Sequence, residues 1–202
     1  DAQAMSNIRT VALSIAPDKV ISTVASDLNE FIYGQQINLS GIFTLSDKQP
    51  IASLPVHVEV KTPSDLNWRE VTQLITGIDG KVSLPIYLGQ NQSIRIRSDG
   101  TWDRLEGISN EQIIKVKPQI KIAAPTSAAI NSKVNISGIV NPGKQVSVSL
   151  ERFDGKWSQV AATSTDINGA YAFQYPSGSG PFLNLRVSAS GSQSAAVTIV
   201  LR

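Results

Sequence analysis

The sequence predicts an all-β protein built from two copies of one domain, and three observations lead to this expectation. The heptapeptide INLSGIF at Ile37–Phe43 returns as VNISGIV at Val134–Val140. Apolar and polar residues alternate over short runs, as in half-buried strands. Pairs of Asp or Asn followed by Gly, a strong hairpin-turn signal, separate these runs at 79–80, 99–100, 154–155 and 168–169. No stretch carries a convincing helical apolar period.

The repeat contains a second landmark that fixes its extent. The first block recurs at a shift of 97 positions, from 37 to 134, whereas TGIDG from Thr76 matches TDING from Thr165 at a shift of 89. The first copy is therefore eight residues longer between the two blocks, and we place the extra residues in LSDKQPIASLP, Leu45–Pro55. Matched landmarks in the same order indicate a duplicated domain.

The strands of each copy follow from the alternation. In the second copy we predict strands over 119–122, 133–140, 145–153, 156–163, 170–175, 183–189 and 195–201. Seven short strands in about 85 residues suit an immunoglobulin-like sandwich. The first copy is expected to run from an opening strand near Val11–Ile15 to a closing strand near Gln112–Lys117. The predicted fold class is thus all-β, with two tandem immunoglobulin-like β-sandwich domains.

The domain boundary falls at a junction with almost no spacer. We assign residues 1–117 and 118–202 to the two domains, and we treat the first ten residues as a connection from an upstream region. The closing strand of one domain runs into the opening strand of the next, and Pro118 restricts the backbone between them. We therefore expect a stiff, end-to-end pair.

Composition excludes several classes of function. Of the 202 residues, 41% are hydrophobic and 17% charged, which is typical of a globular protein, and the net charge of +2 is scattered along the chain. This pattern argues against a nucleic-acid surface. The absence of cysteine excludes disulfides, thiolate metal sites and cysteine nucleophiles. No apolar run is long enough to insert into a membrane, and a start at Asp1 without Met leads us to expect an export signal upstream.

Several segments resemble a known family. YGQQINLSG from Tyr33, PVHVEV from Pro55, a tryptophan about eight residues on and a Thr-x-x-x-Gly turn resemble bacterial immunoglobulin-like (Big-type) repeats of secreted and surface proteins, especially those of actinobacteria. The second copy keeps PGKQVSVSLERFDGKWSQV, Pro142–Val160, but has Ile130 and Asn131 where the Tyr33-Gly34 pair would fall. The resemblance implies a fold and a secreted or cell-surface bacterial location, and it implies no activity.

Catalytic and metal sites are not expected. His57, the single histidine, is predicted on the polar face of a strand as a surface residue with no obvious carboxylate partner. GxSxG is absent, which argues against a Ser-His-Asp hydrolase. Glu59, Glu70 and Glu151 are predicted on solvent faces, although a cross-strand carboxylate pair, as in a glycosidase, stays open. DING at Asp166–Gly169 lacks the later ligands of a calcium loop. We therefore predict no catalytic, metal-binding or cofactor-binding residue, and no enzyme.

A tryptophan without a repeat partner marks the one candidate ligand site. Trp68 and Trp157 are equivalent and are expected to pack on the fold, whereas Trp102 stands alone in the polar loop SDGTWDRLEG. An exposed tryptophan can stack on a sugar or anchor a partner. The candidate ligand-binding residues are Trp102, Arg104 and Arg97, and a role for Trp102 in capping the end of the sandwich stays open.

The sequence leads to one function and one alternative. The first is a non-catalytic module of a bacterial exported or cell-envelope protein, acting as a spacer or as a binding and adhesion module. The alternative is a carbohydrate-binding accessory region of a cell-wall or polysaccharide-degrading enzyme whose catalytic domain lies upstream. The expected partner is a surface polysaccharide or another envelope protein, not a nucleic acid. Function is expected in the unrepeated segments, the insertion after Phe43 and the loop around Trp102.

Overall fold

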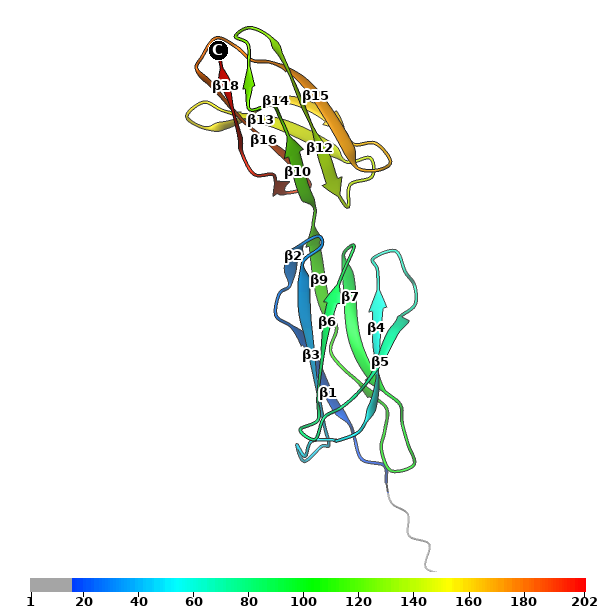
Figure 1. Cartoon of the computed structure of the whole chain (residues 1–202). Helices are drawn as coiled ribbons and strands as arrows, with labels where there is room; N and C mark the ends of the chain where they lie inside the picture. The colour runs from blue at the N-terminus through cyan, green and yellow to red at the C-terminus, as the bar shows by residue number, and fades with distance from the viewer. Residues whose placement is uncertain (1–15) are drawn as a thin grey trace, which may run out of the picture.

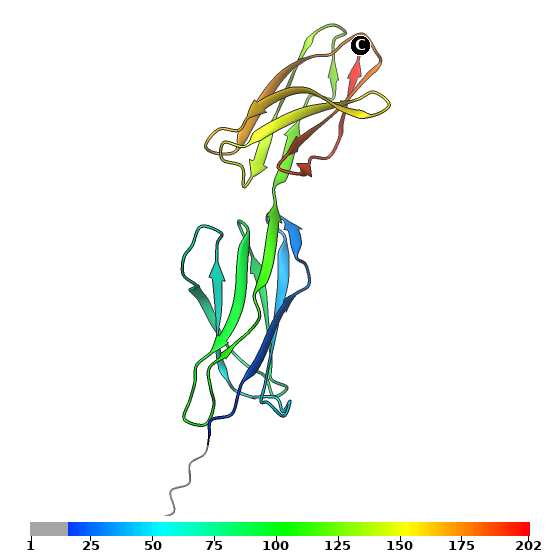
Figure 2. The ribbon, with the colours of Figure 1, turned by 180° about the vertical axis from the view of Figure 1, so that it is seen from behind.

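The computed structural model describes residues 16–202, which form two β-sandwiches placed end to end (Figures 1 and 2). Strands are the only regular elements in this part of the chain, so the prediction of an all-β protein with two tandem immunoglobulin-like sandwiches is confirmed. No helix in residues 16–202 could cross a membrane. The predicted opening strand at Val11–Ile15 and the predicted connection at residues 1–10 lie outside the described residues.

The first sandwich contains nine strands in two sheets. They are β1 (Ile21–Ser26), β2 (Glu30–Ile32), β3 (Gln36–Thr44), β4 (Pro55–Lys61), β5 (Arg69–Ile75), β6 (Lys81–Tyr87), β7 (Gln92–Ser98), β8 (Gly107–Ile108) and β9 (Gln112–Lys117). One sheet has the order β1-β3-β6 and the other the order β2-β9-β7-β4-β5, with β8 paired to β7. The short strand β2 runs parallel to β9, and the other strand pairs are antiparallel.

The second sandwich repeats this arrangement strand for strand. Its strands are β10 (Gln119–Ala123), β11 (Ser127–Ala128), β12 (Lys133–Asn141), β13 (Ser147–Phe153), β14 (Trp157–Ser164), β15 (Ala170–Pro176), β16 (Phe182–Ala189), β17 (Ser192–Gln193) and β18 (Val197–Leu201). The sheets have the orders β10-β12-β15 and β11-β18-β16-β13-β14, with β17 paired to β16. Seven of these strands match predicted ones. The other two, β11 and β17, are each two residues long, which is too short for an apolar alternation to predict them.

The repeated heptapeptides lie on β3 and β12 and point alternate residues inward, as the alternation predicts, whereas Ile42 and Ile139 are exposed. Ile37 and Phe43 are both 0% exposed, and Ile136 on β12 is also 0% exposed. Asn38 and Ser40 face water. Each sandwich holds its own core of buried aliphatic and aromatic side chains, which is enough to hold the two sheets together without a disulfide.

Glycine is required in both heptapeptides because other groups approach its Cα closely. A Cβ on Gly138 would overlap the backbone oxygen of Lys121 and the hydroxyl of Tyr171. A Cβ on Gly41 would lie 2.6 Å from Cδ1 of Ile96. The approach is tighter in the second sandwich, where the obstacle is backbone.

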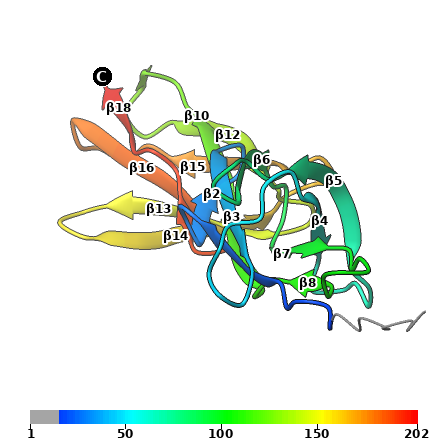
Figure 3. The same ribbon diagram turned by 90° about the horizontal axis from the view of Figure 1, so that it is seen from below.

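The junction consists of Pro118 alone. β9 ends at Lys117 and β10 begins at Gln119, and the backbone N–H of Tyr33 donates to the Lys117 oxygen at 2.8 Å. Figure 3, which looks along the pair from below, shows the N-terminal end of the first sandwich on the side away from the second. The loops at that end are therefore unobstructed by the second sandwich.

Candidate functional site

Matching equivalent residues of the two sandwiches shows where the first is longer than the second. Phe43 and Val140 occupy one position, as do Ile51 and Gly143, because their backbone groups make the same contacts. Seven residues, 44–50, lie between the first pair, where the second sandwich has only two, 141–142. Five of the eight extra residues thus lie in this β3–β4 insertion. The other three lie in the β4–β5 loop, because Glu59 matches Glu151 at a shift of 92 and Trp68 matches Trp157 at 89. Placing all eight at Leu45–Pro55 was therefore wrong.

A second unrepeated segment surrounds Trp102. Ser98 and Gly107 pair across β7 and β8 just as Ala189 and Ser192 pair across β16 and β17. Eight residues, 99–106, connect the strands in the first sandwich, and two, 190–191, connect them in the second. The first sandwich therefore has a long β7–β8 loop where its duplicate has a tight hairpin turn.

The β3–β4 insertion and the β7–β8 loop meet through Asp18. The backbone N–H of Asp18 donates to the Asp103 oxygen at 2.8 Å, and that of Leu105 donates to the Asp18 oxygen at 2.8 Å. On the other side, the Ser46 hydroxyl donates to Oδ1 of Asp18 at 2.8 Å. One short segment before β1 therefore ties together the two segments that distinguish this sandwich from the other.

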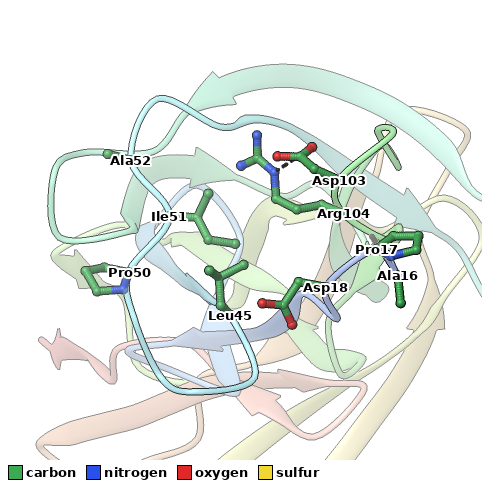
Figure 4. A pocket seen from close by; sticks show the side chains of 9 residues that line it. All are labelled: Ala16, Pro17, Asp18, Leu45, Pro50, Ile51, Ala52, Asp103 and Arg104. Carbon is green, nitrogen blue, oxygen red and sulfur yellow. Dashed lines mark ion pairs between the residues drawn. The ribbon is translucent and has the colours of Figure 1, made fainter. Parts of the chain in front are cut away.

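Between them lies a cavity of about 730 Å³, which we call the end pocket (Figure 4). It combines an apolar wall with three charged side chains, and its lining is Ala16, Pro17, Asp18, Leu45, Pro50, Ile51, Ala52, Asp103 and Arg104. Ile51 is anchored in the core at 5% exposure, whereas the Arg104 side chain is 30% exposed. The volume is in the range of small-ligand sites, about 300–1,000 Å³.

Some polar atoms of the charged groups in the end pocket have no hydrogen-bond partner among the described residues. Nε of Arg104 lies 3.6 Å from Oδ1 of Asp103, and within residues 16–202 this buried nitrogen has no hydrogen-bond partner. The Thr101 hydroxyl donates to Oδ1 of Asp103 at 2.6 Å and is the main cause of the lowered pKa of that carboxyl group. No donor in the described chain reaches Oδ2 of Asp18 or of Asp103. The pocket therefore offers both donors and acceptors to a ligand.

The structure separates the three residues predicted to bind a ligand. Arg104 lines the end pocket, and Trp102, which is 80% exposed, projects from the same loop without lining it. An indole this exposed does not cap the sandwich. Arg97 instead lies on the outer face of β7, where its guanidinium bonds Glu59, Asp99 and Glu106.

Arg97 acts on the loop rather than in the pocket. Asp99 and Glu106 are the first and last residues of the β7–β8 loop, and Nη1 of Arg97 contacts both, at 3.4 Å in the case of Glu106. Its Nε donates to Oε1 of Glu59 on β4 at 3.0 Å. The hydrogen bonds that Arg97 donates to Asp99 and then to Glu59 raise the pKa of Arg97. Arg97 therefore fastens the base of the Trp102 loop to the sheet.

The prediction that His57 is a surface residue without a carboxylate partner was wrong. The residue is 9% exposed; its Nδ1 lies 2.8 Å from Oε2 of Glu70, and its Nε2 lies 3.0 Å from Oδ2 of Asp99. It lies on the outer face as the alternation predicts, but the carboxylates come from β5 and from the β7–β8 loop. Sequence spacing does not show which residues meet across neighbouring strands.

Glu59 and Glu151 also differ from expectation, because arginines cover them. The Glu59 side chain is 11% exposed and accepts from Nε of Arg95 at 2.7 Å; that of Glu151 is 16% exposed and accepts from Nε of Arg186 at 2.6 Å. Burial acts to raise the pKa of each glutamate, but the hydrogen bonds outweigh it and the pKa is lowered. Long arginine side chains lie along the sheet and remove this face from water.

The paired tryptophans complete these contacts. The Arg95 guanidinium lies 4.4 Å from the ring centroid of Trp68, and that of Arg186 lies 4.3 Å from Trp157. Both indoles are half-buried, so the expected packing role is confirmed. The Glu-Arg-Trp stack is part of the duplicated fold, whereas Trp102 takes part in no such contact.

The pKa shifts of the described carboxyl groups are all in one direction. Every one whose pKa departs from its ordinary value has it lowered, whereas a general acid at neutral pH needs a raised pKa. No group of three or more His, Asp or Glu residues in residues 16–202 is arranged to hold a metal ion.

Comparisons with known proteins give only distant likenesses. No family model matches the chain, and no curated protein matches it. The chain is similar to the D0-D1 domain of Intimin, with 15% identity, a TM-score of 0.34, and coverage of 88% of this chain and 97% of that one. It is also similar to E. coli alpha-2-macroglobulin in its native conformation, with 10% identity, a TM-score of 0.39 and coverage of 90% of this chain but only 17% of that one. At such TM-scores, the fold assignment rests on the strand topology described above.

The sequence identified the two unrepeated segments but not the whole pocket between them. The insertion after Phe43 was identified from the length difference and the Trp102 loop from its unpaired tryptophan, whereas Asp18 and the apolar wall of Leu45 and Ile51 were not identified. Asp18 follows Pro17 in a segment with no strand pattern, and only its register opposite Arg104 shows its role. A comparison of the strand registers of the two copies could have found the wall.

Proposed function

We propose that this chain is a non-catalytic binding module of a bacterial exported or cell-envelope protein. Its duplicated sheets form the scaffold, and the free end of the first sandwich is the binding surface. The observation that supports this most is the meeting of the two unrepeated segments around one pocket, at the end away from the second sandwich. Functional residues are commonly carried by loops that a rigid scaffold positions.

The envelope location and the relationship to Big-type repeats are part of this proposal, and the resemblance of the heptapeptides and of Pro142–Val160 supports them. A spacer role is compatible with the single-proline junction, because an extended pair of sandwiches presents its far end at a defined distance. The absence of a raised carboxyl pKa among the described residues supports a binding role over a hydrolytic one.

The test blocks the matching turn of one sandwich at a time. The chain contains no cysteine, so a single cysteine can be labelled selectively with a bulky polyethylene glycol maleimide. Ile78 is 91% exposed on the β5–β6 turn, close to the end pocket in the fold, and Ile167 is 65% exposed at the equivalent turn of the second sandwich. Labelled Ile78→Cys and Ile167→Cys chains are compared for binding to the envelope fraction of the organism that encodes the protein.

We expect the label at Ile78→Cys to abolish binding and the label at Ile167→Cys to leave it unchanged, because only the first lies beside the end pocket. Equal binding by both labelled chains would show that the free end of the first sandwich is not the binding surface.

A further inference from the structure

The charge of the end pocket restricts what it can bind. Asp18 and Asp103 contribute two negative charges and Arg104 one positive charge, so the lining is net negative. The carboxyl group of Asp103 is ionised at neutral pH, as is usual for an aspartate, and the hydrogen bond from Thr101 lowers its pKa further. Polyanions such as nucleic acids or acidic peptides are repelled by such a site. A ligand must therefore be neutral or cationic.

The arrangement of donors and acceptors favours a neutral ligand over a cationic one. A lysine or arginine side chain would satisfy the two carboxylates, but it would place its charge beside the Arg104 guanidinium. Hydroxyl groups avoid this conflict, because a hydroxyl can accept from the guanidinium and donate to a carboxylate. Arg104 and Asp103, whose side chains lie together in Figure 4, can hold one hydroxyl in this way, and Oδ2 of Asp18 can accept from a second hydroxyl.

The neighbouring apolar surfaces suit the rest of a sugar ring. The indole of Trp102 is 80% exposed on the loop that also carries Arg104, and its flat face is available to pack on the C–H groups of a pyranose. Leu45 and Ile51 provide a second apolar surface inside. Since Arg97 fastens both ends of the loop, little conformational entropy remains to be lost on binding.

We propose that the end pocket binds a neutral saccharide, with Arg104 and Asp103 holding one hydroxyl group, Asp18 accepting from another, and Trp102 packing on the sugar face. This inference rests on the proposed function, since it assigns a ligand class to the same surface. It makes Arg97 a positioning residue rather than a ligand-binding one.

The test is affinity gel electrophoresis of the whole chain in gels containing β-glucan, xylan, galactomannan or arabinan, with alginate as a polyanionic control. The variants are Trp102→Ala and Arg104→Gln, with Arg104→Lys to retain charge but not the planar donor set. Ile78→Ala is the matched control, because it removes an apolar side chain that is 91% exposed outside the pocket. Circular dichroism and thermal unfolding confirm that each variant is folded.

We expect at least one neutral polysaccharide to retard the wild-type chain and the Ile78→Ala chain, and alginate to retard neither. Trp102→Ala and Arg104→Gln are each expected to raise the dissociation constant about tenfold or more, with Arg104→Lys intermediate. Retardation that none of these three variants affects would overturn the inference, as would retardation in none of the neutral gels.

Two further outcomes separate this inference from the proposed function. If no neutral gel retards the chain while the label at Ile78→Cys still blocks envelope binding, the saccharide inference fails and the binding surface stands. Tight binding of an oligolysine peptide that Arg104→Gln strengthens would assign the pocket to a cationic partner and would also overturn the saccharide inference.

Discussion

The two sandwiches place different chemistry at the same sheet positions. His57, Glu70 and Arg97 in the first correspond to Ser149, Gln159 and Ser188 in the second. The contacts are preserved although the residues are not: His57 lies 2.8 Å from Glu70, and the Ser149 hydroxyl donates to Gln159 at 3.1 Å. Glu59 and Glu151 both hold an arginine that lies over a tryptophan.

The difference in outer-face residues accompanies a difference in length between the β7–β8 loop and the β16–β17 turn. The charged residues of the first sandwich reach Asp99 and Glu106, which end an eight-residue loop, whereas the second sandwich turns in two residues and needs no such support. Both sandwiches thus share the contacts that hold the sheets, and the first also has ion pairs that hold a longer loop. The following predictions test this comparison, from the largest expected effect to the smallest.

The largest difference is expected between alanine substitutions at the two heptapeptide glycines, measured as the loss in free energy of unfolding. Gly138→Ala is expected to destabilise the second sandwich by about 3 kcal/mol or more, because the new Cβ meets backbone at Lys121. Gly41→Ala should cost about 1–2 kcal/mol, because Ile96 and Val82 can move side-chain ends. Urea unfolding of the whole chain, with hydrogen exchange resolving the two sandwiches, measures both. A Gly41→Ala cost equal to that of Gly138→Ala would contradict the distinction.

Neutralising the covered glutamate of each outer face should cost more stability in the first sandwich than in the second. Within residues 16–202, Glu59→Gln removes the only anion of Arg95 and one of the three anions of Arg97, whereas Glu151→Gln removes the anion of Arg186 alone. We expect losses of about 2–3 kcal/mol for Glu59→Gln and about 1–2 kcal/mol for Glu151→Gln. The same urea and exchange measurements apply. If Glu151→Gln proves the more costly, the network of the first sandwich is not the stronger one.

Acid should weaken the first sandwich more than the second. The pKa of Glu59 is lowered by Arg95 and Arg97 against burial, and that of Asp99 by Arg97 and then His57; on the outer face of the second sandwich, Glu151 alone is lowered. A folded-state pKa below the unfolded value gives stability above about pH 4.5 that is lost as the pH falls through the folded values. Hydrogen exchange between about pH 6 and 3 should show β4 and β7 deprotected before β13 and β16. Simultaneous loss would contradict this.

The smallest effect is expected from exchanging one contact for its counterpart. His57→Ser together with Glu70→Gln installs the residues that the second sandwich uses at the same positions. Because a donor and an acceptor are again paired, we expect a change of less than about 1 kcal/mol in the free energy of unfolding. His57→Ala alone is the control and should cost more, since it leaves the carboxylates of Glu70 and Asp99 without their shared partner. A costly double exchange would show that the two contacts are not equivalent.

The sequence predicted the sandwiches well because alternation and the duplicated landmarks are local signals. Val56, Val58 and Val60 are buried as their spacing indicates, and β9 has the predicted bounds. The outer face was predicted poorly, because Glu59 is covered by arginines of a neighbouring strand and His57 is held between carboxylates of β5 and of the β7–β8 loop. The candidate site was located only as far as its loops, since the position of Asp18 beside Arg104 is set by tertiary pairing.

The most direct test of the central claim shortens the unrepeated segments to the lengths found in the second sandwich. Residues 44–50 are replaced by Asn-Pro and residues 99–106 by Ser-Gly, as at 141–142 and 190–191. The shortened chain and the wild type are compared for binding to the envelope fraction, with hydrogen exchange in the second sandwich as a check on its folding. We predict loss of binding, with exchange in β10–β18 unchanged. Wild-type binding by the shortened chain would contradict the assignment of function to this end of the molecule.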